Sequence, residues 1–202
     1  MTILNLSFFQ NSFLRLLLTI TLFLAASLLP FAGLVFLLFL PLVLYVLCFL
    51  ADPGKTLLAF LASLCVVTIL LWALNASASA PALAAAGFAG MLMFWTVQKR
   101  FSVEGVVLLP SLLLVGAIAL YFIYGGMQLS ITPWQLVEKR IQEAVELNIR
   151  LYSQFPLNAE EIQEITNSKP QMISLFTMIF PALCVIAAVF TIWINLLAAG
   201  RL

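Results

Sequence analysis

The sequence has no histidine, few charged residues and no paired cysteine motif, and each shortage argues against a class of function. Without histidine, the chain lacks the commonest acid–base side chain and the commonest ligand of transition metals. Cys48, Cys65 and Cys184 lie far apart within apolar segments, so we expect them to pack as small hydrophobic residues. A formal net charge of +1 offers no basic surface to nucleic acid. We therefore expect no enzyme, no cofactor, no metal site and no nucleic-acid partner.

Apolar residues dominate instead. They make up 64% of the chain, with a mean hydropathy of +1.18, whereas only 8% of residues are charged. Soluble domains carry about 25% charged residues, so this composition predicts a protein embedded in the lipid bilayer. We expect six apolar runs to cross about 30 Å of hydrocarbon as helices, the fourth of them only just; they are residues 13–29, 31–50, 56–74, 82–97, 106–124 and 171–199. We predict an all-α polytopic membrane bundle of six transmembrane helices in a single domain, 1–202, with the first run retained rather than cleaved as a signal peptide.

The polar stretch 126–170 stands apart, because it holds ten of the seventeen charged residues. Thr132, Pro133 and Gln135 have the order of a capping box with proline at the first helical position. Apolar residues then recur at three- and four-residue intervals, which predicts an amphipathic helix. Asn158 and Glu161 predict a second, short helix that ends near residues 167–168, before a proline. We expect an extramembrane helical insertion between the fifth and sixth spans, entered through a flexible Gly125-Gly126 pair.

Charge pairs and basic residues add detail to this topology. On the amphipathic helix, Lys139 with Glu143 and Glu146 with Arg150 are four residues apart and could pair. With six spans, the basic residues outside the insertion share one side of the membrane; they are Arg15, Lys55, Lys99, Arg100 and Arg201. The positive-inside rule then places both termini in the cytoplasm of a bacterial inner-membrane protein and the insertion outside. Four basic residues within the insertion oppose this orientation, although six acidic residues outnumber them.

Polar and aromatic residues gather near the predicted outer ends of the spans. The ordinary interpretation is an interfacial aromatic belt. The alternative is a small-molecule pocket capped by the insertion, since pockets combine aromatic walls with a few polar groups. The candidate ligand-binding residues are Trp72, Asn75, Tyr121, Tyr124, Gln128 and Trp134. No predicted span carries a carboxylate or lysine at mid-depth, so we predict no catalytic residue and no ion relay.

Small residues and prolines inside the spans bear on packing. Ala82, Ala86 and Gly90 are spaced by four, which lets two helices approach closely in lipid. We favour a partner helix within the chain, with a separate membrane protein as the alternative for this stripe or for residues 132–168. Pro41 and two further prolines within spans, Pro110 and Pro181, indicate either a bent cage around a ligand or ordinary kinks.

Several segments resemble a known family. Residues 138–152 and 157–162, the Phe180-Pro181 pair and the terminal residues 193–201 are similar to the YybS-like family of uncharacterised bacterial membrane proteins. That resemblance implies a distant likeness to the substrate-binding components of energy-coupling-factor transporters, which have six spans and cytoplasmic termini. It also implies that this chain, ending at Leu202, is a short member or a fragment. The first span lacks the alanine-every-four pattern with which those components dock their partner.

Two functions follow as hypotheses. The first is an integral inner-membrane protein that binds a small molecule or lipid in an outward-facing pocket, like a transporter substrate-binding component. The alternative is a non-enzymatic membrane scaffold that docks a partner during envelope assembly.

Overall fold

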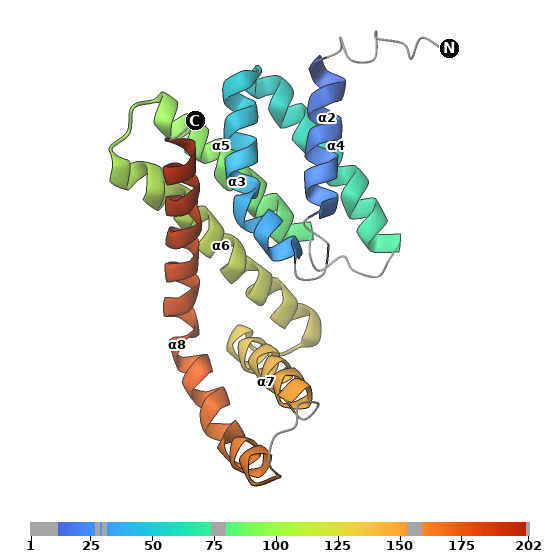
Figure 1. Cartoon of the computed structure of the whole chain (residues 1–202), viewed down its shortest axis with the longest axis vertical. Coiled ribbons are helices and arrows are strands. Elements are labelled where there is room, and N and C mark those ends of the chain that lie inside the picture. The colour runs from blue at the N-terminus through green and yellow to red at the C-terminus, as the bar shows by residue number, and fades with distance from the viewer. Residues whose placement is uncertain (1–11, 27–28, 30–31, 74–79, 153–158, 201–202) are drawn as a thin grey trace. The chain divides into compact units, whose positions relative to one another are not determined.

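The computed structural model describes residues 12–26, 29, 32–73, 80–152 and 159–200, and its regular elements are α-helices (Figure 1). In chain order these are α2 (Ser12–Ala26), α3 (Ala32–Leu50), α4 (Pro53–Ala73), α5 (Ala80–Gln98), α6 (Val103–Leu129), α7 (Pro133–Tyr152) and α8 (Ala159–Ala199). No strand occurs within those ranges, and the predicted all-helical fold class is confirmed.

Five of the helices, α3 to α6 and α8, are long and apolar enough to cross a membrane. Helix α2 is shorter, with an apolar part at Leu16–Ala26. Its 15 residues extend for about 22 Å, less than the hydrocarbon thickness of about 30 Å. Residues 27–28, where the predicted first span continues, lie outside the described residues. The count of six spans therefore stays a prediction.

The described chain divides into two compact units. The larger unit is Met1–Ala117 together with Ala187–Leu202, and the smaller unit is Ile118–Ile186. In the larger unit α2 packs on α4 and α3 packs on α5. Their buried apolar residues recur every three or four positions; they include Leu16, Ile20, Leu24, Leu40, Leu44, Phe60, Val67, Leu71 and Leu83. A polar contact crosses this core, where the Thr21 hydroxyl donates to Ser63 Oγ at 3.0 Å.

A second polar contact in the larger unit lies at Pro41. The amide of Asn195, on α8, accepts a hydrogen bond from Leu42 N at 3.0 Å and donates to Leu38 O at 2.8 Å and Thr191 O at 2.6 Å. Leu38 and Leu42 are four residues apart, so their carbonyl and N–H would bond to each other in an undisturbed helix. Pro41 has no N–H to donate to Leu37 O, and its ring crowds the turn that contains Leu38 and Leu42. The fully buried Asn195 amide thus supplies both backbone groups with a partner from another helix.

Small residues of α5 face the inside of the same unit. Ala86, Ala89 and Gly90 are buried. A Cβ atom added to Gly90 would lie 2.7 Å from the Cα of Pro41, so only glycine permits this approach of α5 to α3. The close approach predicted from the small-residue spacing is found within the chain. Ala86 and Gly90 are therefore occupied internally and are not free to dock a separate protein, whereas Ala82 is exposed.

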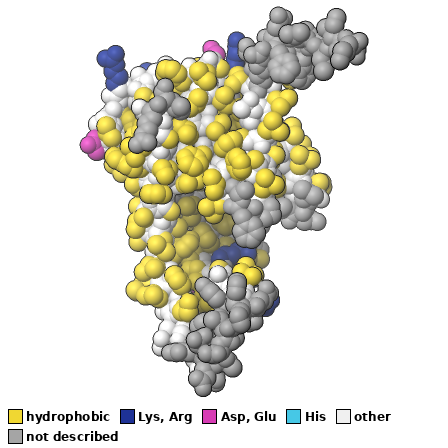
Figure 2. Space-filling view, in the orientation of Figure 1, with side chains coloured by type: hydrophobic (Ala, Val, Ile, Leu, Met, Phe, Trp, Pro, Cys, Tyr) yellow, Lys and Arg dark blue, Asp and Glu magenta, His cyan; other side chains and the backbone are white. Residues whose placement is uncertain are grey.

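Charged residues of the larger unit gather at one end. Figure 1 shows the start of α2, the α3–α4 turn, the α5–α6 turn and the end of α8 at this same end. The two turns carry Asp52, Lys55, Lys99 and Arg100, while hydrophobic side chains cover much of the face drawn in Figure 2. Asp52 caps α4 by accepting bonds from Gly54 N at 2.8 Å and Lys55 N at 3.2 Å. The predicted shared side of Lys55, Lys99 and Arg100 agrees with this arrangement.

Two predicted helix boundaries are wrong. The fifth apolar run continues as helix beyond Tyr124 to Leu129. The second insertion helix does not end near residues 167–168, because α8 runs without interruption through Pro170 into the apolar segment. Proline removes one backbone donor, but the flanking turns can still form, and membrane proteins often keep such prolines inside helices.

Candidate functional site

The smaller unit begins with a tight reversal between α6 and α7. Ser130 takes a left-handed conformation with φ of 53°, and Ile131 N donates back to Gly126 O at 3.0 Å, which ends α6. A Cβ atom on Gly126 would lie 2.9 Å from Ile131 O, so glycine is needed for close packing here. The expectation that Gly125-Gly126 loosens the chain is therefore wrong. These glycines lie inside α6 and let the start of α7 fold tightly against it.

The predicted capping box starts α7. Gln135 N donates to Thr132 Oγ1 at 3.2 Å, and Thr132 N donates to Gln135 Oε1 at 2.8 Å. The two bonds form the reciprocal pair that defines this motif, and Pro133 is the first helical residue. The second predicted box cannot be compared, because Asn158 and the side chain of Glu161 lie outside the described residues.

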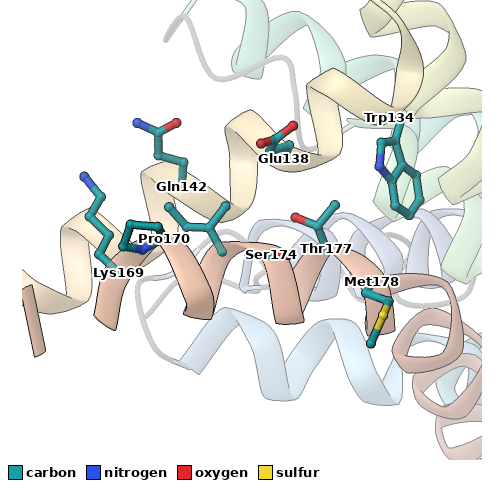
Figure 3. Close-up of a pocket in the computed structure, with 9 residues that line it drawn as sticks. Trp134, Glu138, Gln142, Lys169, Pro170, Ser174, Thr177 and Met178 are labelled. Atoms are coloured by element: carbon teal, nitrogen blue, oxygen red, sulfur yellow. The ribbon is translucent and has the colours of Figure 1, made fainter. Parts of the chain in front are cut away.

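An open groove of about 620 Å³ lies between helices α7 and α8 (Figure 3). One row of α7, spaced by four residues, forms the first wall: Trp134, Glu138 and Gln142. The facing wall comes from α8: Lys169, Pro170, Ile173, Ser174, Thr177 and Met178. The groove therefore combines an indole, a carboxylate, two hydroxyls and an amide with apolar surface, as small-molecule sites do.

Thr177 is the unusual member of this groove. The residue is only 6% exposed, and its hydroxyl has no hydrogen-bond partner among the described residues. Buried polar groups nearly always have a partner, because leaving one unpaired costs about 1–3 kcal/mol. On the same helix, Thr191 shows the usual solution, since its hydroxyl donates to Ala187 O at 2.7 Å. Thr177 is thus a residue of the groove lining whose buried donor and acceptor has no partner among the described residues.

Two residues of the groove lining, Gln142 and Lys169, form a polar cluster with Glu146, here called the Glu146 clasp. Lys169 Nζ lies 2.7 Å from Glu146 Oε1, and Gln142 Nε2 donates to the same oxygen at 3.0 Å. The pKa of Glu146 is lowered below its ordinary value of 4.5. The hydrogen bond from Lys169 is the main cause, and the hydrogen bond from Gln142 is the second. The clasp joins α7 to α8 and neutralises the charge of Lys169.

The remaining charges of α7 pair differently from the prediction. Glu143 pairs with Arg140 at 2.9 Å instead of with Lys139. That hydrogen bond is the first cause that raises the pKa of the Arg140 guanidinium, and Tyr121 acts in the same direction. Glu138 has no ion pair or hydrogen bond with any described residue, and its carboxylate borders the groove.

The structure assembles only one of the six predicted site residues into this groove. Trp134 lines it and is 49% exposed. Tyr121, Tyr124 and Gln128 lie on α6 in the same unit but outside the groove lining. The other two candidates are not in the groove lining. Trp72 belongs to the larger unit and is 75% exposed, and Asn75 lies outside the described residues.

Sequence reasoning missed Glu138 and Thr177. A signal was present, because Trp134, Glu138 and Gln142 share one face of a helix at four-residue spacing. The facing set on α8 has the same spacing at Lys169, Ile173 and Thr177.

The groove lining offers groups that can bind a ligand. Among the described residues, no group of three histidine, cysteine, aspartate or glutamate side chains is placed to hold a metal ion. The groove lining offers one carboxylate, hydrogen-bonding hydroxyls and an aromatic surface. These groups can orient a polar ligand while its apolar part contacts Ile173 and Met178.

Comparison with known proteins identifies one family. A family model described as "Predicted membrane protein (DUF2232)" matches residues 17–202, which is nearly the whole chain. The match agrees with the resemblance to YybS-like membrane proteins, and it leaves the likeness to energy-coupling-factor components a prediction. No curated protein and no solved structure matches the chain.

Proposed function

The chain belongs to the DUF2232 family of predicted membrane proteins, and we propose that this integral membrane protein binds a small molecule or lipid in the groove between α7 and α8. The observation that carries the proposal is the buried, unpartnered hydroxyl of Thr177, a residue of the groove lining. A bound ligand would give this hydroxyl the partner that the described residues do not provide. We propose binding without catalysis, because the groove contains no nucleophile set beside a base.

Helix lengths support a groove that water can reach. Helix α8 has 41 residues, about 60 Å at about 1.5 Å per residue. The hydrocarbon layer is about 30 Å thick. The C-terminal half of α8 suffices to cross it, so the first half, with Ser174 and Thr177, can extend to the membrane surface. The charged Glu146 clasp also favours this position, since ionised groups avoid hydrocarbon.

The distribution of basic residues supports an outward orientation. Lys55, Lys99 and Arg100 share one end of the larger unit, which we propose faces the cytoplasm of a bacterial inner membrane. Helix α6 starts next to Arg100 and is apolar enough to cross the bilayer. The segment that follows α6, including α7, would then emerge on the outer side.

The experiment compares two threonines of the same helix. Thr177→Val removes the open hydroxyl, while Thr191→Val removes one that is already satisfied by its own helix. Purified protein in nanodiscs is screened against lipids and polar metabolites by native mass spectrometry. We expect ligand retention that Thr177→Val weakens by about two- to tenfold, the value of one hydrogen bond, and that Thr191→Val leaves unchanged. The proposal would be refuted if neither substitution changed ligand binding, or if no ligand bound to the protein.

A second function, docking of a membrane-protein partner, is favoured by one observation. Leu147 and Leu151 on α7 are 60% and 47% exposed and lie four residues apart, so they form an apolar strip on an otherwise polar helix. Photocrosslinking from position 147 in intact cells tests this idea. A single specific protein adduct would support docking, whereas adducts with lipid alone would exclude it.

A further inference from the structure

The charges of the groove favour a cationic group. Two charged side chains line it, Glu138 and Lys169. The ammonium of Lys169 is already neutralised by Glu146 at 2.7 Å, in the Glu146 clasp. The carboxylate of Glu138 has no such partner among the described residues. The uncompensated charge in the groove is therefore negative.

An aromatic ring lies beside that charge. Trp134 precedes Glu138 by one helical turn and lines the same groove, so the two side chains project from the same face of α7 (Figure 3). An indole face attracts cations through its quadrupole, more strongly than phenyl or phenol rings do. A carboxylate and an indole one turn apart are thus suited to hold an ammonium group between them.

The facing wall supplies a complementary polar contact. Thr177 presents an unpartnered hydroxyl that is nine-tenths buried, and Ser174 offers a second hydroxyl nearby. These groups can donate to a ligand oxygen, such as that of a hydroxyl, an ester or a phosphate. Apolar side chains, Ile173 and Met178, flank the two hydroxyls along the wall.

We propose that the groove takes a ligand bearing an ammonium group, held between Glu138 and Trp134, with an oxygen of the same ligand bonded to Thr177. This inference rests on the proposed binding function and specifies the chemical class of the ligand. An amino alcohol carries both groups. It can be a free molecule or the ethanolamine headgroup of a phospholipid, and the chemistry of recognition is shared.

The test uses Trp134 itself as the reporter. The other three tryptophans, at positions 72, 95 and 193, are exposed, so replacing them with phenylalanine leaves a single fluorophore in the groove. This protein is placed in phosphatidylglycerol nanodiscs, which contain no amine. It is then titrated with free ethanolamine in one arm and compared with nanodiscs containing phosphatidylethanolamine in the other. The two arms distinguish a soluble ligand from a lipid headgroup.

Glu138→Gln removes the charge at nearly constant shape, and Glu143→Gln is the matched control because Glu143 pairs with Arg140 away from the groove lining. We expect the amine to change Trp134 fluorescence, and Glu138→Gln to weaken its binding by about ten- to hundredfold, the value of one charged hydrogen bond. Glu138→Asp should restore part of the affinity, and Glu143→Gln should have no effect.

Three outcomes would overturn the inference. Binding of ligands that lack an amine, sensitive to Thr177→Val but not to Glu138→Gln, would refute the ammonium assignment and leave the proposed function standing. Equal binding of the amine by the protein and by Glu138→Gln would refute it as well. Absence of any ligand, charged or neutral, would refute both the inference and the proposed function.

Discussion

Replacing Asn195 with leucine should destabilise the larger unit strongly, because its amide joins α8 to α3 at Pro41. The substitution removes three hydrogen bonds, including those to Leu42 N and Leu38 O. Bonds of this kind in membrane proteins average about 0.6 kcal/mol, which gives about 2 kcal/mol for the three. Leaving two buried backbone groups unpaired costs about 1–3 kcal/mol each. The expected loss in free energy of unfolding is therefore about 2–6 kcal/mol, where the lower end follows from the average bond value and the upper end from two fully unpaired backbone groups.

A double-mutant cycle isolates the cause. Pro41→Ala restores a backbone donor and lets Leu42 N bond to Leu38 O within α3, so the Asn195 amide is no longer needed there. We expect Asn195→Leu to cost less than about 1 kcal/mol in the Pro41→Ala background, a coupling of at least about 1 kcal/mol. Unfolding is measured by steric trapping in bicelles.

The matched control is Asn148→Leu. Asn148 is exposed, and its side-chain amide donates only to Ala144 O of its own helix, so the same chemical change should shift stability by less than about 0.5 kcal/mol. Equal costs of Asn195→Leu with and without Pro41 would show that the amide does not act through the proline turn.

Three further substitutions test other contacts. Gly90→Ala should destabilise the protein by about 1–3 kcal/mol, because its new methyl group meets the backbone of α3. The control is Gly116→Ala, whose methyl group meets nothing within 4 Å and which should be neutral or stabilising. Equal effects of the two substitutions on thermal unfolding would contradict this account. Thr177→Val should raise the stability of the ligand-free protein by up to about 2 kcal/mol by removing an unpaired buried hydroxyl, whereas a loss in stability would indicate an internal partner. Glu146 has a lowered pKa, so its bond to Lys169 stabilises the protein above pH 4.5 and is lost as the pH falls below that value. The protection of α7 amides from hydrogen exchange, corrected for the intrinsic pH dependence of exchange, should therefore fall in acid, and Glu146→Gln should show the lower protection already at pH 7.

Local chemistry was readable from the sequence, and contacts over long distances were not. The reciprocal bonds of Thr132 and Gln135 were predicted correctly, because a capping box depends on residues three positions apart. The end of α6 was misjudged, since Gly125-Gly126 serves the packing of α7 rather than chain flexibility. Pro170 gave a similar error, because a proline marks a disturbed turn without deciding whether the helix continues.

The candidate groove could be found only in part for the same reason. Trp134 was predicted from its aromatic side chain near a span end. Thr177 has an ordinary sequence neighbourhood, and its significance comes from being buried without a partner, which requires the packing of α7 on α8. The role of Asn195 was equally hidden, because its partners on α3 lie more than 150 positions away.

The central claim is that the α7–α8 groove opens to the outer side of the membrane. Cysteine labelling in intact cells tests this claim most directly. In a background without Cys48, Cys65 and Cys184, single cysteines are placed at Ser174, which lines the groove, and at Ser102, in the α5–α6 turn. An impermeant maleimide should label position 174 but not position 102, and an ammonium ligand should protect position 174. Labelling of position 102 with no labelling of position 174 would contradict the account.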